Sequence, residues 1–231
     1  MEVVILCGGK GIRLVPKTMH VPKPMLNIGD MPILEHIIRF FSKYGHNDFI
    51  LCLGYKGAVI KGYFKDKKEW NIKFLDTGEN SSKGDRLRIA KGVIKGGKFF
   101  VAYGDDLSDV NLNSVIDFHN SHNGIATLTA TRLKSPFGII NFDESRKVLD
   151  FEEKPILDHY INGGFFVFDK KIFDFLEEGE DIEKDLFPKL SKKDLVYAYK
   201  HDGFWACMNT HQDNVTLNEL WNKKEAKWKV W

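Results

Sequence analysis

A glycine-rich turn with several cations around it stands near the start of the chain. The stretch "LCGGKGIRL" places Gly8, Gly9 and Gly11 directly after the apolar run "EVVI". Glycines let a backbone turn sharply and let its N–H groups approach an anion closely. Basic side chains gather in the same region: Lys10, Arg13, Lys17 and Lys23. Such a cluster suits a ligand with several negative charges, such as a triphosphate.

Two familiar phosphate-binding patterns do not fit this turn. A dinucleotide-binding fingerprint requires glycine where the chain has Leu14, and a Walker A loop requires Gly-Lys-Ser or Gly-Lys-Thr, which the sequence lacks. The pattern alone therefore leaves a second interpretation open, a glycine turn with a solvated basic rim.

Further charged residues follow later apolar runs. Asp105 comes after "KFFVAYG", and Arg86 lies in a predicted helix after "FLDTG". Ligands of open α/β sheets bind beyond the carboxyl ends of the strands. We therefore expect the polar clusters 8–13, 77–86 and 104–106 to meet at one edge of a sheet. A capping or turn aspartate and an exposed helix arginine are the alternatives.

Alternating strands and helices must position these clusters. Apolar runs predict strands at 3–7, 48–54, 71–78 and 98–106, and helices at 30–45, 57–65, 83–94 and 113–122. This alternation predicts an α/β fold with a mostly parallel, Rossmann-like central sheet and helices on both faces. Closely spaced strands at 125–133, 137–143, 147–153 and 163–169 predict a small antiparallel patch in the C-terminal half. Helices at 170–177 and 182–190, a strand at 195–200 and a C-terminal helix complete the pattern.

Composition limits the possible partners. The 231 residues carry a net charge of +2, which does not indicate a general nucleic-acid or membrane surface. No apolar run approaches the roughly 18 residues of a membrane span. Cys7, Cys52 and Cys207 lie far apart in apolar segments, which predicts free thiols in a reducing cytoplasm.

Several segments together resemble one family. The glycine turn followed by "PKPM" resembles the signature of the sugar-1-phosphate nucleotidyltransferases. Other similar segments follow in order to the last residue: "FLDTGENSSKGDRL", "AYGDD", "FEEKP", "NGGFFVF", "HDGFWACMNT" and "KWKVW". They are most similar to the cytidylyltransferase branch that acts on glucose 1-phosphate. The resemblance implies that CTP and a sugar 1-phosphate give a CDP-sugar and pyrophosphate by direct in-line attack, with Mg²⁺ as cofactor.

The resemblance also implies roles for individual residues. The implied catalytic residues are Arg13, Lys23 and Asp105. The implied nucleotide-binding residues are Leu6, Gly8, Gly9, Gly11, Ile12, Arg13, Gly78, Arg86 and Gly104. The implied sugar-phosphate-binding residues are Glu153, Lys154, Asn162 and Gly163, and the implied metal ligands are Asp105 and Asn209. We expect one domain over 1–231, with a nucleotide-binding half at 1–123 and a sugar-phosphate-binding half at 124–231.

The chain departs from the family pattern at three places. Ile12 replaces the usual threonine, and Asn209 replaces the expected second metal-binding aspartate, whose amide oxygen can coordinate a metal without the negative charge. The segment 64–71 is shorter than expected where family members make subunit contacts, although we still expect a homo-oligomer. An enzyme with another nucleotide or acceptor phosphate and a catalytically impaired nucleotide-binding paralogue stay open. Leu14 opposes a dinucleotide-binding oxidoreductase.

Overall fold

A seven-stranded mixed sheet forms the centre of the molecule. The computed structural model describes residues 1–11, 14 and 17–231. The strands run in the order β12 (Val196–His201), β8 (Ala126–Lys134), β11 (Ile156–Asp169), β6 (Lys98–Tyr103), β1 (Val3–Leu6), β4 (Asp48–Leu53) and β5 (Asn71–Asp76). All neighbouring strands are parallel except that β11 runs antiparallel to both β6 and β8. The predicted, mostly parallel Rossmann-like sheet is confirmed.

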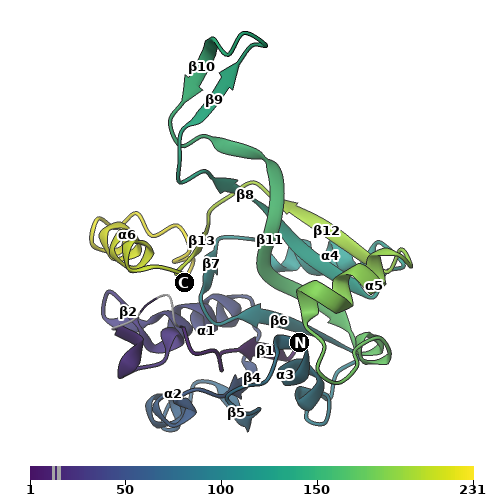
Figure 1. Cartoon of the computed structure of the whole chain (residues 1–231). Helices are drawn as coiled ribbons and strands as arrows, with labels where there is room; N and C mark the ends of the chain where they lie inside the picture. The colour runs from purple at the N-terminus through teal and green to yellow at the C-terminus, as the bar shows by residue number, and fades with distance from the viewer. Residues whose placement is uncertain (12–13, 15–16) are drawn as a thin grey trace.

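Helices cover both faces of this sheet, as predicted (Figure 1). One face packs against α1 (Ile33–Lys43), α2 (Gly57–Phe64), α4 (Leu112–Asn120) and α6 (His211–Asn222). The opposite face packs against α3 (Lys83–Ala90), the turns η4 (Lys170–Asp174) and η5 (Ile182–Leu186), and α5 (Phe187–Ser191). The helix predicted at 170–177 is a short 3-10 turn, and the one predicted at 182–190 begins as a π turn.

The central strands are buried on both faces of the sheet, and successive side chains join the hydrophobic clusters on opposite faces. All side chains of β1 are buried, which is typical of a parallel strand covered on both faces. Val3 and Ile5 join the cluster on one face, whereas Val4 and Leu6 join the cluster on the other. A buried strand of this kind holds its carboxyl end, and the turn that follows it, in a fixed position.

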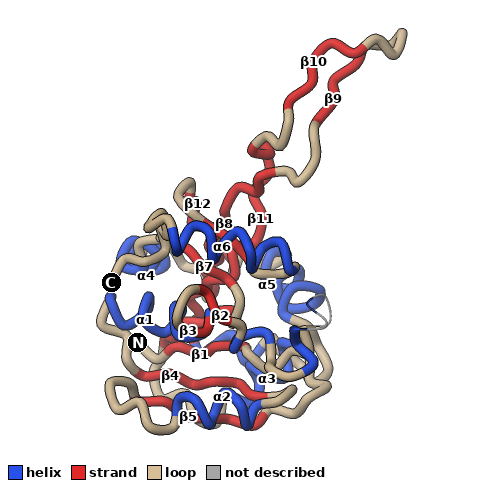
Figure 2. Tube along the Cα trace, turned by 90° about the vertical axis from the view of Figure 1, so that its left-hand side faces the viewer, coloured by secondary structure: helices blue, strands red, loops and turns tan. Residues whose placement is uncertain are grey.

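Small antiparallel sheets complete the fold. The pairs are β2 (Asn27–Ile28) with β3 (Met31–Pro32), β7 (Asp106–Ser108) with β13 (Trp205–Cys207), and β9 (Ile139–Phe142) with β10 (Val148–Glu152). Of the four strands predicted to form an antiparallel patch in the C-terminal half, those at 137–143 and 147–153 form the separate β9–β10 pair, whereas those at 125–133 and 163–169 join the central sheet as β8 and β11. The β9–β10 pair projects away from the body, as two views at right angles agree (Figures 1 and 2).

Two sequence-based limits can be compared with the structure. All three cysteines are free thiols, with Cys7 and Cys52 buried and Cys207 partly buried. Within the described part of the chain, no helix is both long enough and apolar enough to span a membrane. Short 3-10 turns at Lys17–Met19 (η2) and Lys23–Met25 (η3) follow the glycine turn.

Candidate active site

A cleft of about 680 Å³ opens at the carboxyl ends of β1 and β6. Its walls bring together described residues from all three predicted polar clusters. From the glycine turn come Leu6 and Gly8–Gly11, from the second cluster Glu79–Ser81, Lys83 and Arg86, and from the third Gly104–Asp106. Other lining residues include Lys23, Asn162, Glu183, Trp205, Cys207 and Asn209. The expectation that these clusters meet at one sheet edge is therefore confirmed for the described residues.

The glycine turn is tightly packed on one side and open on the other. A side chain on Gly8 would place its Cβ only 2.0 Å from Nη1 of Arg86, so only glycine fits there. Nothing lies within 4 Å of a Cβ built on Gly9, which is exposed to the cleft. Gly11 adopts a φ of 60°, which glycine tolerates without strain. The turn can thus present backbone N–H groups to a ligand at close range.

Residues 12 and 13 lie outside the described part of the chain. The predicted phosphate contact of Arg13, and the effect of isoleucine instead of threonine at Ile12, therefore stay predictions. Other cations of the cluster are placed. Lys10 reaches across to the 77–82 loop, where its Nζ lies 3.0 Å from Oδ1 of Asn80. Lys17 donates to Oδ1 of Asn214 in α6 at 2.8 Å, and so contributes its charge to another part of the molecule.

Arg86 is a buried cross-link beneath the glycine turn. Its guanidinium donates to the carbonyl oxygens of Gly8 (3.1 Å) and Leu53 (3.1 Å). It also donates to Oγ1 of Thr77 (2.7 Å) and to the carbonyl oxygen of Glu79 (3.2 Å). Burial lowers the pKa of Arg86 from its usual value. The alternative of an exposed helix arginine is wrong, and the guanidinium holds the strand ends that form the cleft floor.

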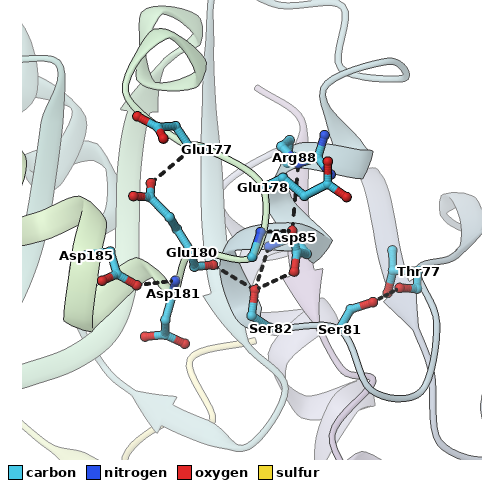
Figure 3. A network of polar contacts seen from close by, with 11 residues as sticks. Thr77, Ser81, Ser82, Asp85, Arg88, Glu177, Glu178, Glu180, Asp181 and Asp185 are labelled. Carbon is cyan, nitrogen blue, oxygen red and sulfur yellow. Dashed lines mark hydrogen bonds and ion pairs between the residues drawn. The ribbon is translucent and has the colours of Figure 1, made fainter.

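A polar network fixes the start of α3 and hence the position of Arg86 (Figure 3). Ser82 caps the helix by accepting from the Asp85 N–H at 2.9 Å, and its hydroxyl donates to the carbonyl oxygen of Glu180 at 2.7 Å. Asp85 accepts from the Gly179 N–H at 2.9 Å. The Gly179 N–H, as the largest cause, and the contact of the Ser82 hydroxyl with Oδ2 of Asp85 (3.0 Å) lower the pKa of Asp85. The helix start is thereby tied to the loop before η5.

Lys23, Asp105 and Asn209 come from three distant segments and meet in the cleft. Asp105 follows β6, Lys23 begins η3, and Asn209 follows β13. The Lys23 ammonium forms an ion pair with Oδ2 of Asp105 and donates to Oδ1 of Asn209 at 2.8 Å. The Asp105 carbonyl oxygen also accepts from the Met208 N–H at 3.0 Å, which joins the two backbones. The structure thus brings together one predicted phosphate contact and both predicted metal ligands.

Asp106 and Cys207 also belong to this site, although the sequence did not assign them roles. The β7–β13 pairing sets Cys207 opposite Asp106, and side-chain atoms of Asp105, Asp106 and Cys207 lie within 4.8 Å of one another. Asp106 is 3% exposed, and burial together with the Asp105 charge raises its pKa. Its Oδ1 has no hydrogen-bond partner among residues 1–11, 14 and 17–231. The adjacent acids in "GDD" signalled Asp106, but only the long-range pairing reveals Cys207.

These residues offer a donor set that fits a hard divalent cation. The Asp105 carboxylate, the Asn209 amide oxygen and the unpaired Asp106 oxygen are the ligand types that Mg²⁺ prefers. Only one of the two predicted ligands carries a charge. The Lys23 ammonium contacts Oδ2 of Asp105 and Oδ1 of Asn209, so a metal ion at this position would compete with Lys23 for these oxygens.

The predicted sugar-phosphate residues divide into two groups. Asn162 lines the cleft and accepts from the Gly164 N–H at 2.9 Å, while the Gly163 carbonyl accepts from Nε1 of Trp205 at 2.8 Å. Glu153 and Lys154 instead lie at the base of the β9–β10 hairpin, largely exposed, with 3.8 Å between Lys154 Nζ and Oε1 of Glu153. Neither lines the cleft, so their predicted role remains untested.

A second, larger hollow of about 1570 Å³ adjoins the cleft. It shares Trp205, Cys207 and Asn209 with the cleft and extends toward the hairpin base through Arg132, Lys134 and Ile156. Lys134 pairs with Ile156 across β8 and β11, two residues beyond Lys154. For Gly78 and Gly104, the structure shows backbone features, and their predicted contact with nucleotide stays a prediction. Gly78 adopts a φ of 84°, and the Gly104 N–H donates to the Leu6 carbonyl at 3.2 Å.

An open α/β sheet with a glycine turn and a polar cleft at its strand ends is typical of a protein that binds phosphate-bearing ligands. Comparison with known proteins agrees with this class. Residues 2–224 match the family described as nucleotidyl transferase, so the chain belongs to that family. It is 39% identical to the glucose-1-phosphate cytidylyltransferase of Salmonella typhi over 257 residues, covering 100% of both chains. It is 37% identical to the probable glucose-1-phosphate cytidylyltransferase of Bacillus subtilis, again over 100% of both chains. The predicted family resemblance is confirmed.

Solved structures agree on the fold. A putative glucose-1-phosphate thymidylyltransferase from Bacillus anthracis superposes with a TM-score of 0.76 at 20% identity, over 95% of this chain and 94% of that chain. HddC from Yersinia pseudotuberculosis gives a TM-score of 0.75 at 24% identity, over 95% of this chain and 99% of that chain. At these identities the likeness supports the architecture alone.

Proposed function

We propose that this chain transfers a cytidylyl group from CTP to a sugar 1-phosphate, most simply glucose 1-phosphate, and releases pyrophosphate. The names of the full-length relatives support the choice of substrates. The observation that carries the proposal is the meeting of Lys23, Asp105 and Asn209 beside the glycine turn. An oxygen of the sugar phosphate forms a bond to the α-phosphorus of CTP. The bond from that phosphorus to the bridging oxygen breaks, and its electron pair leaves on pyrophosphate.

The residues of the chain act in this reaction by positioning and by charge. The glycine turn receives the nucleotide, and Arg13 and Lys23 bind its phosphate oxygens. Lys23 has flexible reach, so it can exchange its contact with Asp105 for one with an incoming phosphate. Arg86 keeps the turn and the 77–79 segment in place rather than donating to substrate.

Asp105 and Asn209 are the residues that we propose to hold Mg²⁺, with Asp106 beside them. When bound, this ion would neutralise charge on the phosphate oxygens. The neutral amide of Asn209 gives the pair less negative charge than two carboxylates would. We therefore expect metal to bind more weakly to the free protein than to the protein with its nucleotide.

The acceptor is proposed to bind on the side of the larger hollow. Asn162 lines the cleft, and the Gly163 carbonyl accepts from Trp205, which lines both cavities. Lys134 and Arg132 supply cationic charge in the larger hollow. Glu153 and Lys154 border the same region in sequence and join the acceptor site in this proposal. The division into a nucleotide-binding half, 1–123, and a sugar-phosphate-binding half, 124–231, follows from these assignments.

Two further aspects belong to the proposal. The three free thiols support a reducing, cytoplasmic setting. The chain is also proposed to assemble with copies of itself and to need no nucleic acid or membrane. A nucleotide-binding paralogue without catalysis is the second candidate, and Asn209 at a proposed metal position is the observation that favours it.

A pyrophosphate-release screen tests the proposed function. Purified protein with Mg²⁺ is incubated with each of the NTPs and a panel of sugar 1-phosphates. We expect release with CTP and glucose 1-phosphate, and none when either substrate is left out. Release with another pair would change the substrates and keep the reaction. No release with any pair, together with a CTP-induced rise in melting temperature, would establish the binding-only paralogue.

A further inference from the structure

A thiol and two carboxylates lie together in the cleft, where β13 runs beside β7 (Figure 1). Cys207 is paired directly with Asp106 in this two-stranded sheet, so the two side chains point to the same face. Sγ of Cys207 also lies 3.8 Å from Oδ2 of Asp105. One ligand atom from each of the three residues lies within 4.8 Å of the other two. The β7–β13 pair thus gathers three donors of the kinds that bind metal ions.

Backbone and side-chain hydrogen bonds hold both ends of this pair. At the cleft end, the Asp105 carbonyl accepts from the N–H of Met208, the residue after Cys207, at 3.0 Å. At the other end, the Ser108 hydroxyl donates to the Phe204 carbonyl at 3.0 Å. Folding of the chain therefore brings the three donors together, and no ion is needed to assemble them.

Asp106 supplies the observation that points to a ligand. Its side chain is only 3% exposed, yet it lines the cleft. Oδ1 of Asp106 is buried and has no hydrogen-bond partner among the residues that the structure describes. Buried carboxylate oxygens are normally paired with a donor or with a metal ion. Gly164, with a φ of 76°, leaves room for this carboxylate, because a Cβ there would overlap Oδ2 of Asp106.

The mixture of sulfur and oxygen donors selects the class of ion. Mg²⁺ binds oxygen ligands, whereas Zn²⁺ binds cysteine sulfur at about 2.3 Å and carboxylate oxygen at about 2.0–2.2 Å. With these bond lengths, tetrahedral ligand atoms lie roughly 3.3–3.8 Å apart. The 3.8 Å between Sγ of Cys207 and Oδ2 of Asp105 already has this spacing. The remaining distances, within 4.8 Å, close by about 1 Å when the side chains rotate.

We propose that Asp105, Asp106 and Cys207 form a binding site for Zn²⁺, with a water molecule as the fourth ligand. On binding, the Cys207 thiol loses its proton to solvent, and the thiolate sulfur donates an electron pair to the ion. The site differs from the proposed Mg²⁺ position in its ion and in its ligands, because it uses the sulfur of Cys207 instead of the amide oxygen of Asn209. Its existence does not rest on cytidylyl transfer.

Zn²⁺ in this site has a consequence for the proposed reaction. The Lys23 ammonium forms an ion pair with Oδ2 of Asp105, and an ion bound to Asp105 displaces it. Asp105 would then be held by Zn²⁺ and would be lost to Mg²⁺. We therefore expect Zn²⁺ to inhibit the chain rather than to act as its cofactor, and this consequence, unlike the site itself, rests on the proposed function.

Titration of the native chain with Co²⁺ tests the site, with no substrate present. Co²⁺ is the probe because it occupies Zn²⁺ sites, and its bond to a thiolate gives an intense charge-transfer band in the near ultraviolet. We expect this band to grow until one ion is bound per chain. Zn²⁺ in a one-to-one ratio should then remove the band, whereas excess Mg²⁺ should leave it, because Mg²⁺ does not bind thiolate.

Three variants assign the band to individual donors. Cys207→Ser removes the sulfur and should abolish the band. Asp106→Asn keeps the shape of the side chain and removes its charge, and should weaken Co²⁺ binding by at least about tenfold. Cys7→Ala is the matched control, because it removes another thiol that lines the cleft, and it should keep the band. Far-ultraviolet circular dichroism checks that every variant is folded.

Three results would overturn the proposal. The first is a native chain without a sulfur-to-cobalt band, a result that depends on no variant. The second is a band that persists in Cys207→Ser, because another thiol would then bind the ion. The third is displacement of Co²⁺ by Mg²⁺ as readily as by Zn²⁺, which would make this the ordinary Mg²⁺ position. Pyrophosphate release by the native chain that Zn²⁺ fails to inhibit would contradict only the expected inhibition.

Discussion

Replacing Arg86 with methionine should weaken both the fold and nucleotide binding, because one side chain joins three segments at the cleft: the glycine turn, the end of β4 and the 77–79 segment. The variant removes hydrogen bonds to Gly8, Leu53, Thr77 and Glu79, at 2.7 to 3.2 Å. Each hydrogen bond to a charged group contributes about 1.5–3 kcal/mol, and such contributions are not additive within one side chain. Relief from burying a charge offsets part of the loss. We expect the free energy of unfolding to fall by roughly 3–5 kcal/mol.

A matched control lies two residues further along the same helix. Arg88 has a side chain that is 38% exposed, and its ion pairs with Asp85 and Glu178 are 3.7 Å and 3.6 Å long. Exposed pairs of this kind contribute about 0–1 kcal/mol, so Arg88→Met should cost less than about 1 kcal/mol. Urea unfolding followed by circular dichroism measures both variants against the native chain.

Calorimetric titration with CTP completes this test. Loss of the Gly8 anchor should weaken CTP binding by at least about tenfold in Arg86→Met, which corresponds to ~1.4 kcal/mol. Arg86→Lys should fall between the two because an ammonium cannot span all the acceptors. Equal unfolding free energies for Arg86→Met and Arg88→Met would refute the cross-link. Unchanged CTP affinity in a destabilised Arg86→Met variant would show that Arg86 stabilises the fold without supporting nucleotide binding.

Three further predictions follow from contacts in the site and the core. Gly8→Ala should lose stability and CTP affinity because its Cβ would meet Arg86, whereas Gly9→Ala should be tolerated because its Cβ meets nothing. Urea unfolding and CTP titration measure both variants, and similar losses in the two would contradict this packing. Asn209→Asp should tighten Mn²⁺ binding to the free protein by about tenfold, as followed by electron paramagnetic resonance, because it adds a charge beside Asp105; unchanged binding would remove Asn209 from the metal site. Burial, and then the Met1 ammonium, lower the pKa of His46 to about 4. Between about pH 6.5 and pH 4 the unfolded chain therefore binds more protons than the folded chain. The free energy of unfolding should fall by roughly 2–3 kcal/mol as pH falls through this range. His46→Gln should flatten that part of the unfolding free-energy profile, and an unchanged pH slope would exclude His46 as its source.

Local patterns in the sequence predicted the parallel part of the fold well. Two of the strands after which the polar clusters fall, β1 and β6, are short apolar runs whose burial is readable without a partner, whereas β5 is a partly buried edge strand. The rule that ligands bind at the carboxyl ends then placed Gly8, Arg86 and Asp105 at one edge.

Long-range pairing was not predictable in the same way. The β7–β13 pair joins Ser108 to Trp205 and Asp106 to Cys207, which are distant in sequence, and so brings Cys207 beside Asp105. The Met208 N–H bond to Asp105 and the Lys23 contacts then place Asn209 in the same site. The antiparallel direction of β11 and its start at Ile156 depend on β8 and β6 rather than on its own sequence. Glu153 and Lys154 were assigned by resemblance, and their place at the base of the β9–β10 hairpin could not be read from spacing.

Formation of CDP-glucose would show directly whether the cleft transfers a cytidylyl group. Native protein, Asp105→Asn and the control Asp117→Asn, which changes an exposed carboxylate on α4, are each incubated with CTP, glucose 1-phosphate and Mg²⁺, and the product is separated by anion exchange. We expect equal product from the native chain and Asp117→Asn, and almost none from Asp105→Asn. Undiminished product from Asp105→Asn, or no product from the native chain, would contradict the assignment of the cleft as the site of cytidylyl transfer.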